Sequence, residues 1–189
     1  MDRENLPAWR RLDTRTVRTT PWFEVHEDSV IRPDGVHDVY HHVVSPGSVT
    51  IVALDHRGRV AVTRQWIYTH NNRQWRLPAG AVDASDDTPR AAAERELAEE
   101  TGVRAARWEP IGRVNGADSF TNHVDHVFLA TDLTFGTAAR EAGEADLYLH
   151  WLSFPKALEL VTNGDIRHAG SVCGLLSIGL REEAVAAKP

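Results

Sequence analysis

The segment between Thr88 and Gly102 limits the possible folds of this chain more than any other stretch, because residue types mark both ends of a helix. Thr88 is a good N-cap residue, Pro89 suits the first helical position, and Gly102 suits a left-handed C-terminal cap. This pattern predicts a helix over residues 89–101.

The last turns of this predicted helix carry Glu96, Glu99 and Glu100. At 3.6 residues per turn, Glu96 and Glu100 stack on one another and Glu99 flanks them. These like charges repel one another, and each also faces the negative end of the helix dipole. A divalent cation would relieve the repulsion, and carboxylate oxygens suit Mg2+ or Mn2+. A solvated, charged helix face is the alternative interpretation.

The residues around this helix resemble the Nudix box, a motif of glycine, five residues, glutamate, seven residues, and then Arg-Glu-aliphatic-any-Glu-Glu-any-Gly-aliphatic. Every fixed position of the second half matches, from Arg95 to Val103. Gly80 supplies the first glycine, and Asp87 stands where the first glutamate belongs, although six residues separate the two. Asp86 is the alternative acid. The resemblance implies an α/β fold, the Nudix-type alpha/beta/alpha sandwich around a mixed β-sheet.

The same resemblance implies roles for individual residues. Arg95 would be a structural residue that pairs with Asp87 and orients the metal-binding turn; an ordinary helix ion pair is the alternative. The cofactor would be Mg2+, with Mn2+ possible. The implied metal ligands are the carbonyl of Ala79 and the carboxylates of Glu96, Glu99 and Glu100.

The resemblance also implies that the general base comes from a loop distant from the box in sequence. Glu141 and Glu144 lie just before a predicted strand at residues 147–152, and we favour Glu144. Glu99, within the helix, is the third candidate. A positioned carboxylate base contributes about 10^2 to 10^4 in rate, so mutagenesis distinguishes the three.

Length and composition fit one soluble domain of enzyme size. The chain has 189 residues, 42% of them hydrophobic, which is enough for a substantial core. A net charge of -6 without a basic stripe argues against DNA as a partner. No apolar run reaches the roughly 20 residues of a membrane span, and no secretory region opens the chain, so we expect a cytoplasmic protein.

The order of elements predicts a sheet-rich domain. Turn residues at Pro33-Asp34-Gly35 predict a hairpin between strands 23–31 and 36–44, and the segment 55–58 predicts a second one between strands 49–54 and 60–68. Further strands are predicted at 108–114, 124–131 and 147–152. Ser153 is a candidate cap for a helix at 155–162, and another helix is predicted at 171–183.

Beyond the box, most of the chain resembles the ADP-ribose and nucleoside-diphosphate-sugar pyrophosphatases of the Nudix superfamily. Residues 62–66 and 75–80 look like that group's strand and loop before the box, although Arg76 stands where a glutamate is usual. In this group an N-terminal extension often crosses to a partner subunit. The resemblance therefore implies a hairpin extension at residues 1–45 that forms a homodimer, followed by a hydrolase domain at 46–189.

Several basic and aromatic residues are candidates for binding a nucleotide. Arg64, Arg73 and Arg76 lie near the box and are candidates to clamp phosphate or a terminal ribose, with a solvated loop as the alternative for Arg73. Trp66 and Trp22 are candidates to stack on a base, with core packing as the alternative.

Two histidine patterns do not predict a zinc site. His123 and His126 are three residues apart on a predicted strand, and His41 and His42 are adjacent on another. In both patterns the two side chains point to opposite faces of the sheet, so they do not meet at one ion.

The residues and the resemblance together predict a metal-dependent hydrolase of a nucleoside diphosphate derivative. ADP-ribose or a nucleotide sugar is the favoured small-molecule substrate, with a nucleoside monophosphate and a sugar phosphate as products. The alternatives are a noncatalytic nucleotide sensor and a pyrophosphohydrolase of nucleoside triphosphates or capped RNA. An isomerase of isopentenyl diphosphate shares the fold, but it needs a reactive cysteine, and Cys173 lies in an apolar predicted helix.

Overall fold

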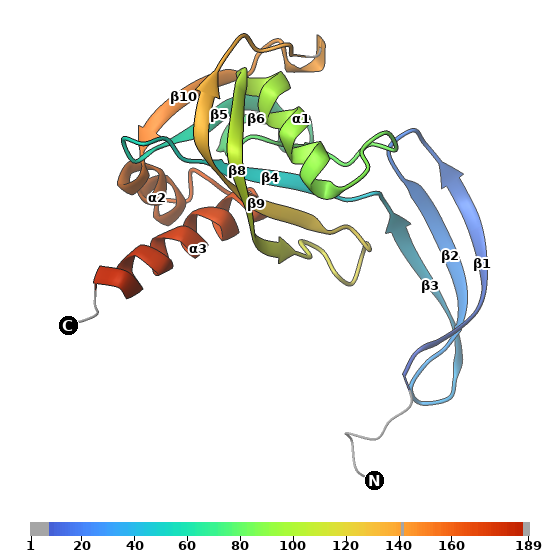
Figure 1. Cartoon of the computed structure of the whole chain (residues 1–189). Coiled ribbons are helices and arrows are strands. Elements are labelled where there is room, and N and C mark those ends of the chain that lie inside the picture. The colour runs from blue at the N-terminus through green and yellow to red at the C-terminus, as the bar shows by residue number, and fades with distance from the viewer. Residues whose placement is uncertain (1–7, 141, 187–189) are drawn as a thin grey trace. The chain divides into compact units, whose positions relative to one another are not determined.

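The computed structural model describes residues 8–140 and 142–186 (Figure 1). The described chain forms two compact units. One contains the residues up to Pro46 together with Asn115–His123, and the other contains Gly47–Val114 and the residues from Val124 onward. Among the described helices, none is long and apolar enough to cross a membrane.

The N-terminal unit is built on an antiparallel sheet in the order β1-β2-β3. The predicted hairpin is present as β2 (Glu24–Ile31) and β3 (His37–Val44). Gly35, with a φ of 84°, closes the turn between them, as the turn residues predicted. A strand that was not predicted, β1 (Arg10–Thr19), pairs with β2. All of its residues are exposed, so its sequence carries no alternation of buried and exposed positions.

The second unit contains two sheets. A four-stranded sheet has the order β7-β4-β9-β8, and β4 runs parallel to β9 while the other pairs are antiparallel, which makes it mixed. An antiparallel sheet has the order β10-β5-β6. The bounds of these strands are β4 (Ser48–Ala53), β5 (Arg59–Ile67), β6 (Asn72–Arg76), β7 (Ala79–Ala81), β8 (Val103–Val114), β9 (Asp125–Phe135) and β10 (Tyr148–Ser153).

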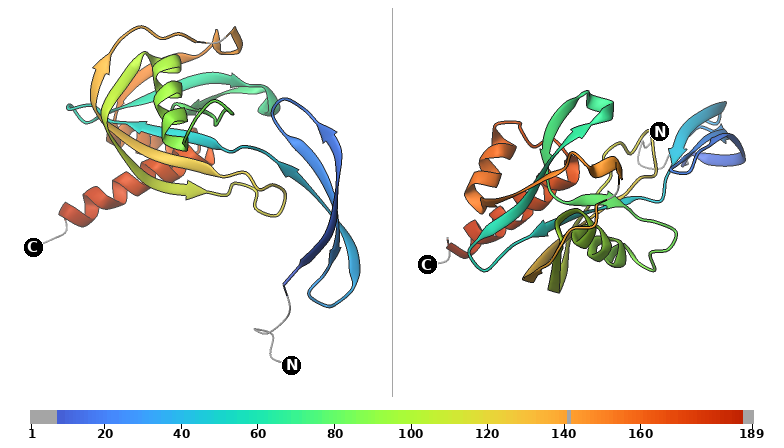
Figure 2. Two further views of the ribbon diagram at one scale, coloured as in Figure 1. Left: turned by 45° about the vertical axis from the view of Figure 1, so that its right-hand side comes forward. Right: turned by 90° about the horizontal axis from the view of Figure 1, so that it is seen from above.

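Helices cover both faces of the four-stranded sheet (Figure 1; Figure 2). Side chains alternate along β4, so Val49 and Ile51 pack with Leu97 of α1 (Pro89–Thr101). Val52, on the opposite face of β4, packs with Leu175 of α3 (Ala169–Ala186). The remaining helix, α2 (Phe154–Thr162), belongs to the same cluster as Val52. This arrangement confirms the predicted alpha/beta/alpha sandwich around a mixed sheet.

The predicted helix at 89–101 is present with its predicted ends. The Thr88 side chain accepts a hydrogen bond from the amide of Ala91, Pro89 occupies the first turn, and Gly102 has a φ of 73°. Ser153 occupies the N-cap position of α2 but makes no side-chain capping bond.

The second predicted hairpin is wrong. Instead of pairing along their length, β4 and β5 lie in different sheets and share one bridge, between Leu54 and Val60. The turn residues at 55–58 are real, since Gly58 has a φ of 69°, but the chain passes from one sheet to the other there. Local turn chemistry cannot distinguish these two outcomes. The short strands β6 and β7 were not predicted.

We expect Gly102→Ala to destabilise the protein by at least about 2 kcal/mol, because Gly102 has a positive φ and its surroundings are crowded. A Cβ at this position would lie 2.6 Å from the Gly136 carbonyl oxygen and 2.7 Å from the Ala138 amide nitrogen. Gly164→Ala is the matched control. Gly164 has a similar φ of 75°, but no atom lies within 4 Å of its Cβ position, so its cost should be about 1 kcal/mol. Urea unfolding measures both, and equal losses would contradict the crowding argument.

Candidate active site

Three carboxylates from two distant segments converge in the second unit. Glu96 and Glu100 lie one turn apart on α1, and Glu144 ends the short 3-10 helix Ala142–Glu144 before β10. One carboxylate oxygen of each lies within 4.8 Å of the others. Glu96 and Glu100 are buried, with only 8% and 2% of their surfaces exposed. Buried carboxylates need compensating partners, so this cluster is unlike an ordinary charged helix face.

The loop before α1 is fitted closely to these glutamates. The Ala79 amide donates a hydrogen bond of 3.1 Å to Oε2 of Glu100. A Cβ at Gly80 would collide with the carboxylate of Glu96, so a larger residue here would displace that carboxylate from its present position. The Leu77 amide donates to Oγ of Ser171 over 2.9 Å, which ties the start of the loop to α3. The ligand role of the Ala79 carbonyl stays a prediction.

Burial dominates the electrostatics of the cluster. Burial raises the pKa of Glu100 to about 8; Arg76 opposes the shift, while Glu144 and Glu96 add to it. Burial also raises the pKa of Glu96, against the opposing charge and hydrogen bond of Arg95. Both groups are therefore costly to ionise in the metal-free protein. A set of carboxylate oxygens that repel one another fits a hard divalent cation such as Mg2+ or Mn2+.

Arg95 connects the helix with the preceding loop. Its Nε and Nη2 donate to the two oxygens of Asp86, at 3.2 and 2.9 Å, and its Nη1 donates to Glu96 at 2.8 Å and Glu99 at 3.0 Å. The predicted pairing with Asp87 is wrong: Asp87 is exposed, and Asp86, the alternative acid, takes its place. Asp86 also accepts a hydrogen bond from the Asp83 amide, which turns its carboxylate toward Arg95.

The candidates for the base have different surroundings. Glu144 lies within the carboxylate cluster, whereas Glu99 is in an ion pair with Arg95. Glu141 lies outside the described residues. The catalytic roles of all three stay predictions.

The prediction that Arg64, Arg73 and Arg76 lie together near the box is wrong for Arg76. On the β5–β6 ladder Arg64 pairs with Trp75, whereas Arg76 pairs with Thr63, the next position along. Because side chains alternate across a sheet, Arg76 points to the opposite face from Arg64 and Trp66.

Other contacts occupy several of the predicted substrate residues. The Arg64 guanidinium lies 5.2 Å from the centre of the Trp75 ring, and Arg73 forms an ion pair of 2.8 Å with Asp146. Trp66 is 45% exposed, and Trp22, in the N-terminal unit, is 73% exposed. Their substrate-binding roles stay predictions.

Arg76 lines a pocket of about 370 Å3 in the second unit. Nε of Arg76 is buried and has no hydrogen-bond partner among the described residues, and its charge acts on Glu100. Sequence reasoning missed Arg167 and His168, two basic residues just before α3 that line the same pocket; the only local signal was that pair of basic residues ahead of a helix. The full lining is Ile67, His70, Asn72, Gln74, Arg76, Arg167 and His168.

Comparison with known proteins agrees with this geometry. A family model for the NUDIX domain matches residues 44–172. The chain belongs to the Nudix family. A model for the nucleoside diphosphate sugar hydrolase N-terminal domain matches residues 9–43.

Named relatives cover most of the chain. An ADP-ribose pyrophosphatase of Mycobacterium tuberculosis (strain ATCC 25618 / H37Rv) is 31% identical over 88% of this chain and 81% of its own length. A CMP-5'-(N-acetyl-N-hydroxy-3-aminopropyl)phosphonate hydrolase of Streptomyces rubellomurinus (strain ATCC 31215) is 30% identical over 90% of this chain and 82% of its own. The crystal structure of an ADP compounds hydrolase matches the fold with a TM-score of 0.83, covering 97% of this chain and 99% of that one at 19% identity.

These matches confirm the predicted family, fold and enzyme class, a Nudix pyrophosphohydrolase similar to ADP-ribose pyrophosphatases. The second half of the Nudix box forms the end of α1. Gly80, the first glycine of the whole box, makes room for Glu96.

The raised pKa of Glu100 leads to a prediction about stability. The folded metal-free protein holds a proton on Glu100 up to about pH 8, whereas the unfolded chain releases it near 4.5. The free energy of unfolding should therefore fall as the pH rises between these values. Glu100→Gln removes this dependence, so in EDTA the variant should gain at least about 1 kcal/mol relative to the wild type between pH 5 and pH 8. Urea unfolding at both pH values tests this, and a constant difference would contradict it.

Proposed function

We propose that this protein hydrolyses the diphosphate linkage of ADP-ribose or a related nucleoside diphosphate sugar, with Mg2+ or Mn2+ as cofactor. The products would be a nucleoside monophosphate and a sugar phosphate. The observation that carries the proposal is the convergence of Glu96, Glu100 and Glu144 within 4.8 Å, with two of the three carboxylates buried.

A diphosphate resists hydrolysis because its negative oxygens repel an incoming nucleophile. Glu96 and Glu100 are the residues that would hold a divalent ion, and charge neutralisation of the diphosphate is the chemistry that the ion supplies when bound. The Ala79 amide fixes the carboxylate of Glu100, and Arg95 fixes that of Glu96. Both ligands are thereby oriented before substrate arrives.

Glu144 is the proposed general base. It comes from a loop rather than from α1, and its carboxylate reaches the two helix glutamates. A carboxylate there would accept the proton of the attacking water as the water attacks phosphorus. Glu99 fits this role less well, because its carboxylate already accepts a hydrogen bond from Arg95.

Arg76 is the proposed contact for a negatively charged part of the substrate. Its Nε is buried without a hydrogen-bond partner among the described residues, and the pocket that it lines also contains Arg167 and His168. A guanidinium with an unused donor is suited to a phosphate oxygen. A substrate that extends beyond the diphosphate on both sides would use this pocket as well as the carboxylate cluster.

The relatives support the substrate class. Two of them are named ADP-ribose pyrophosphatases, from Mycobacterium tuberculosis and Bacillus subtilis (strain 168), and the Streptomyces relative is named for a cytidine nucleotide compound. What these names share is a nucleotide linked to a further group. ADP-ribose is therefore our first choice of substrate, and other nucleotide sugars follow.

We expect Glu144→Gln to lower kcat by about 10^2 to 10^4 with little change in KM, because the variant keeps the shape of the side chain but cannot take a proton. Glu94→Gln is the control, since Glu94 is an exposed residue of α1 that pairs only with Arg90 among the described contacts. Steady-state kinetics with saturating Mg2+ measures both. A normal kcat for Glu144→Gln would exclude this residue as the base.

A substrate panel with product identification tests the function. With Mg2+, ADP-ribose or a nucleotide sugar should have a kcat/KM at least about tenfold above that of nucleoside triphosphates. Arg76→Gln should raise the KM for the preferred substrate by about tenfold or more, whereas Arg107→Gln, at an exposed residue of β8 that pairs with Asp132, should change it little. A triphosphate as preferred substrate, with release of pyrophosphate, would overturn the proposed substrate class.

We also propose that the N-terminal unit forms a homodimer. It exposes large apolar side chains, among them Trp9, Val17, Trp22 and Val39, and a second chain would cover part of this apolar surface. Light scattering during gel filtration should give the mass of two chains at micromolar concentration. The mass of one chain under these conditions would contradict the proposal.

A further inference from the structure

Two histidines and an aspartate meet on one face of the N-terminal sheet. His26 of β2 and His42 of β3 are directly paired across the strands, and Asp28 lies two residues after His26, on the same face. One potential ligand atom from each residue lies within 4.8 Å of the others. We propose that His26, Asp28 and His42 form a Zn2+ site, separate from the carboxylate cluster on α1.

The Asp28–His42 contact already has nearly the spacing of a zinc site. Oδ2 of Asp28 lies 3.1 Å from Nε2 of His42. With metal–ligand bonds of about 2.0 to 2.2 Å, two ligand atoms of a tetrahedral site are roughly 3.3 Å apart. Oδ1 of Asp28 accepts a hydrogen bond of 2.7 Å from Thr14, which orients the carboxylate and leaves Oδ2 for the ion.

His26 has the outer partner that metal-bound histidines commonly have. Its Nε2 lies 2.7 Å from Oε2 of Glu24. When Nε2 donates its hydrogen to Glu24, Nδ1 keeps the lone pair that a metal needs. The carboxylate of Glu24 would thus fix both the tautomer and the orientation of the ring.

Asp28 is suited to be the anionic ligand. It is only 6% exposed. Thr14 and His42 already contact its two carboxylate oxygens, so a cation at Oδ2 would add to these partners.

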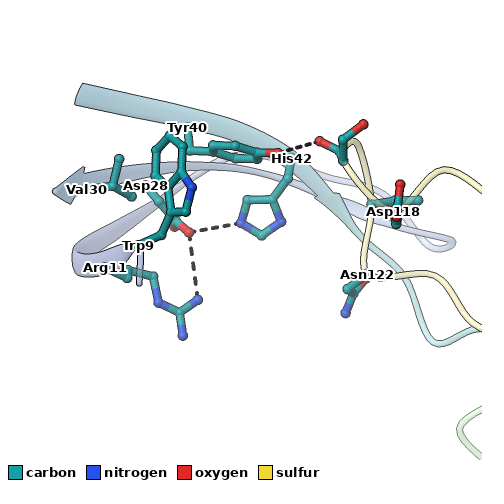
Figure 3. A pocket seen from close by; sticks show the side chains of 10 residues that line it. Trp9, Arg11, Asp28, Val30, Tyr40, His42, Asp118 and Asn122 are labelled. Atoms are coloured by element: carbon teal, nitrogen blue, oxygen red, sulfur yellow. Dashed lines mark hydrogen bonds and ion pairs between the residues drawn. The ribbon is translucent and has the colours of Figure 1, made fainter. Parts of the chain in front are cut away.

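Arg11 places a positive charge beside the proposed site, which would oppose the binding of a cation. Its Nη1 lies 3.8 Å from Oδ2 of Asp28, and Figure 3 shows that Arg11 and His42 both point toward this carboxylate. The Arg11 side chain is 64% exposed, so it is free to swing into solvent when an ion binds. Removing the Arg11 side chain should therefore strengthen metal binding. A cluster that serves only as a structural hydrogen-bond network would not show this effect.

The site borders a pocket of about 490 Å3 within the N-terminal unit. Trp9, Tyr40 and Asn122 line it together with Asp28 and His42 (Figure 3). Three protein ligands leave one position of a tetrahedral ion open, and the pocket gives water or a small ligand atom access to it. Two imidazoles and one carboxylate favour Zn2+ over Mg2+, whereas the all-carboxylate cluster on α1 favours Mg2+.

Cobalt substitution tests the proposal, because Co2+ in a four-coordinate site with nitrogen ligands absorbs visible light strongly and Co2+ among carboxylates and water does not. The wild type should show this absorption for one Co2+ per chain, and Zn2+ should displace it. His26→Ala and His42→Ala should lose it. His41→Ala is the matched control, because His41 is the neighbouring histidine but pairs with Glu27 on the opposite face, and it should keep the signal.

Two further variants separate a metal site from a hydrogen-bond network. Glu24→Gln should weaken Co2+ binding by about 10- to 100-fold, as loss of an outer partner does. Arg11→Ala should tighten Co2+ binding.

If a histidine variant fails to fold, NMR of the wild type decides: Zn2+ should shift the ring signals of His26 and His42 and leave those of His41 in place. Absence of the Co2+ absorption in the wild type, or an unchanged signal in a folded His42→Ala variant, would overturn the proposal.

Discussion

The burial of Glu96 and Glu100 against the loop at Ala79 and Gly80 is the constraint on which the rest of the active site depends. Two carboxylates one turn apart repel one another, and burial raises the pKa of both. The surrounding sequence is shaped by this arrangement. Gly80 makes room for one carboxylate and the Ala79 amide holds the other, while Arg95 ties the helix to its loop. This part of the fold is assembled around a charge cluster that a cation would complete.

Features fixed by neighbouring residues could be predicted from the sequence, and features fixed by strand pairing could not. The ends of α1 follow from Thr88 and Gly102, and the stacking of Glu96 on Glu100 follows from the helical repeat. The partner of Arg95 depends on the path of the loop, which presents Asp86 rather than Asp87. The same limit applies to Arg76, whose face is set by the register between β5 and β6.

The His26–Asp28–His42 cluster also depends on strand pairing. Local spacing correctly separates His41 from His42, since they pair with Glu27 and Asp28 on opposite faces. His42 meets His26 only because β2 and β3 pair in one particular register. The two proposed metal sites thus differ in how they are encoded, one within a helix and its loop and the other across a strand pair. They also differ in donor atoms, so their metal preferences should differ.

The central claim is that the buried glutamates of α1 hold a divalent ion, and Mn2+ binding followed by electron paramagnetic resonance tests it most directly. Removing one carboxylate should weaken binding without unfolding the helix, because the substitution also removes a repulsion. We predict that the wild type binds Mn2+, that Mg2+ competes, and that Glu96→Gln and Glu100→Gln lose this binding while their circular dichroism stays unchanged. Equal Mn2+ binding by the wild type and both folded variants would contradict the account.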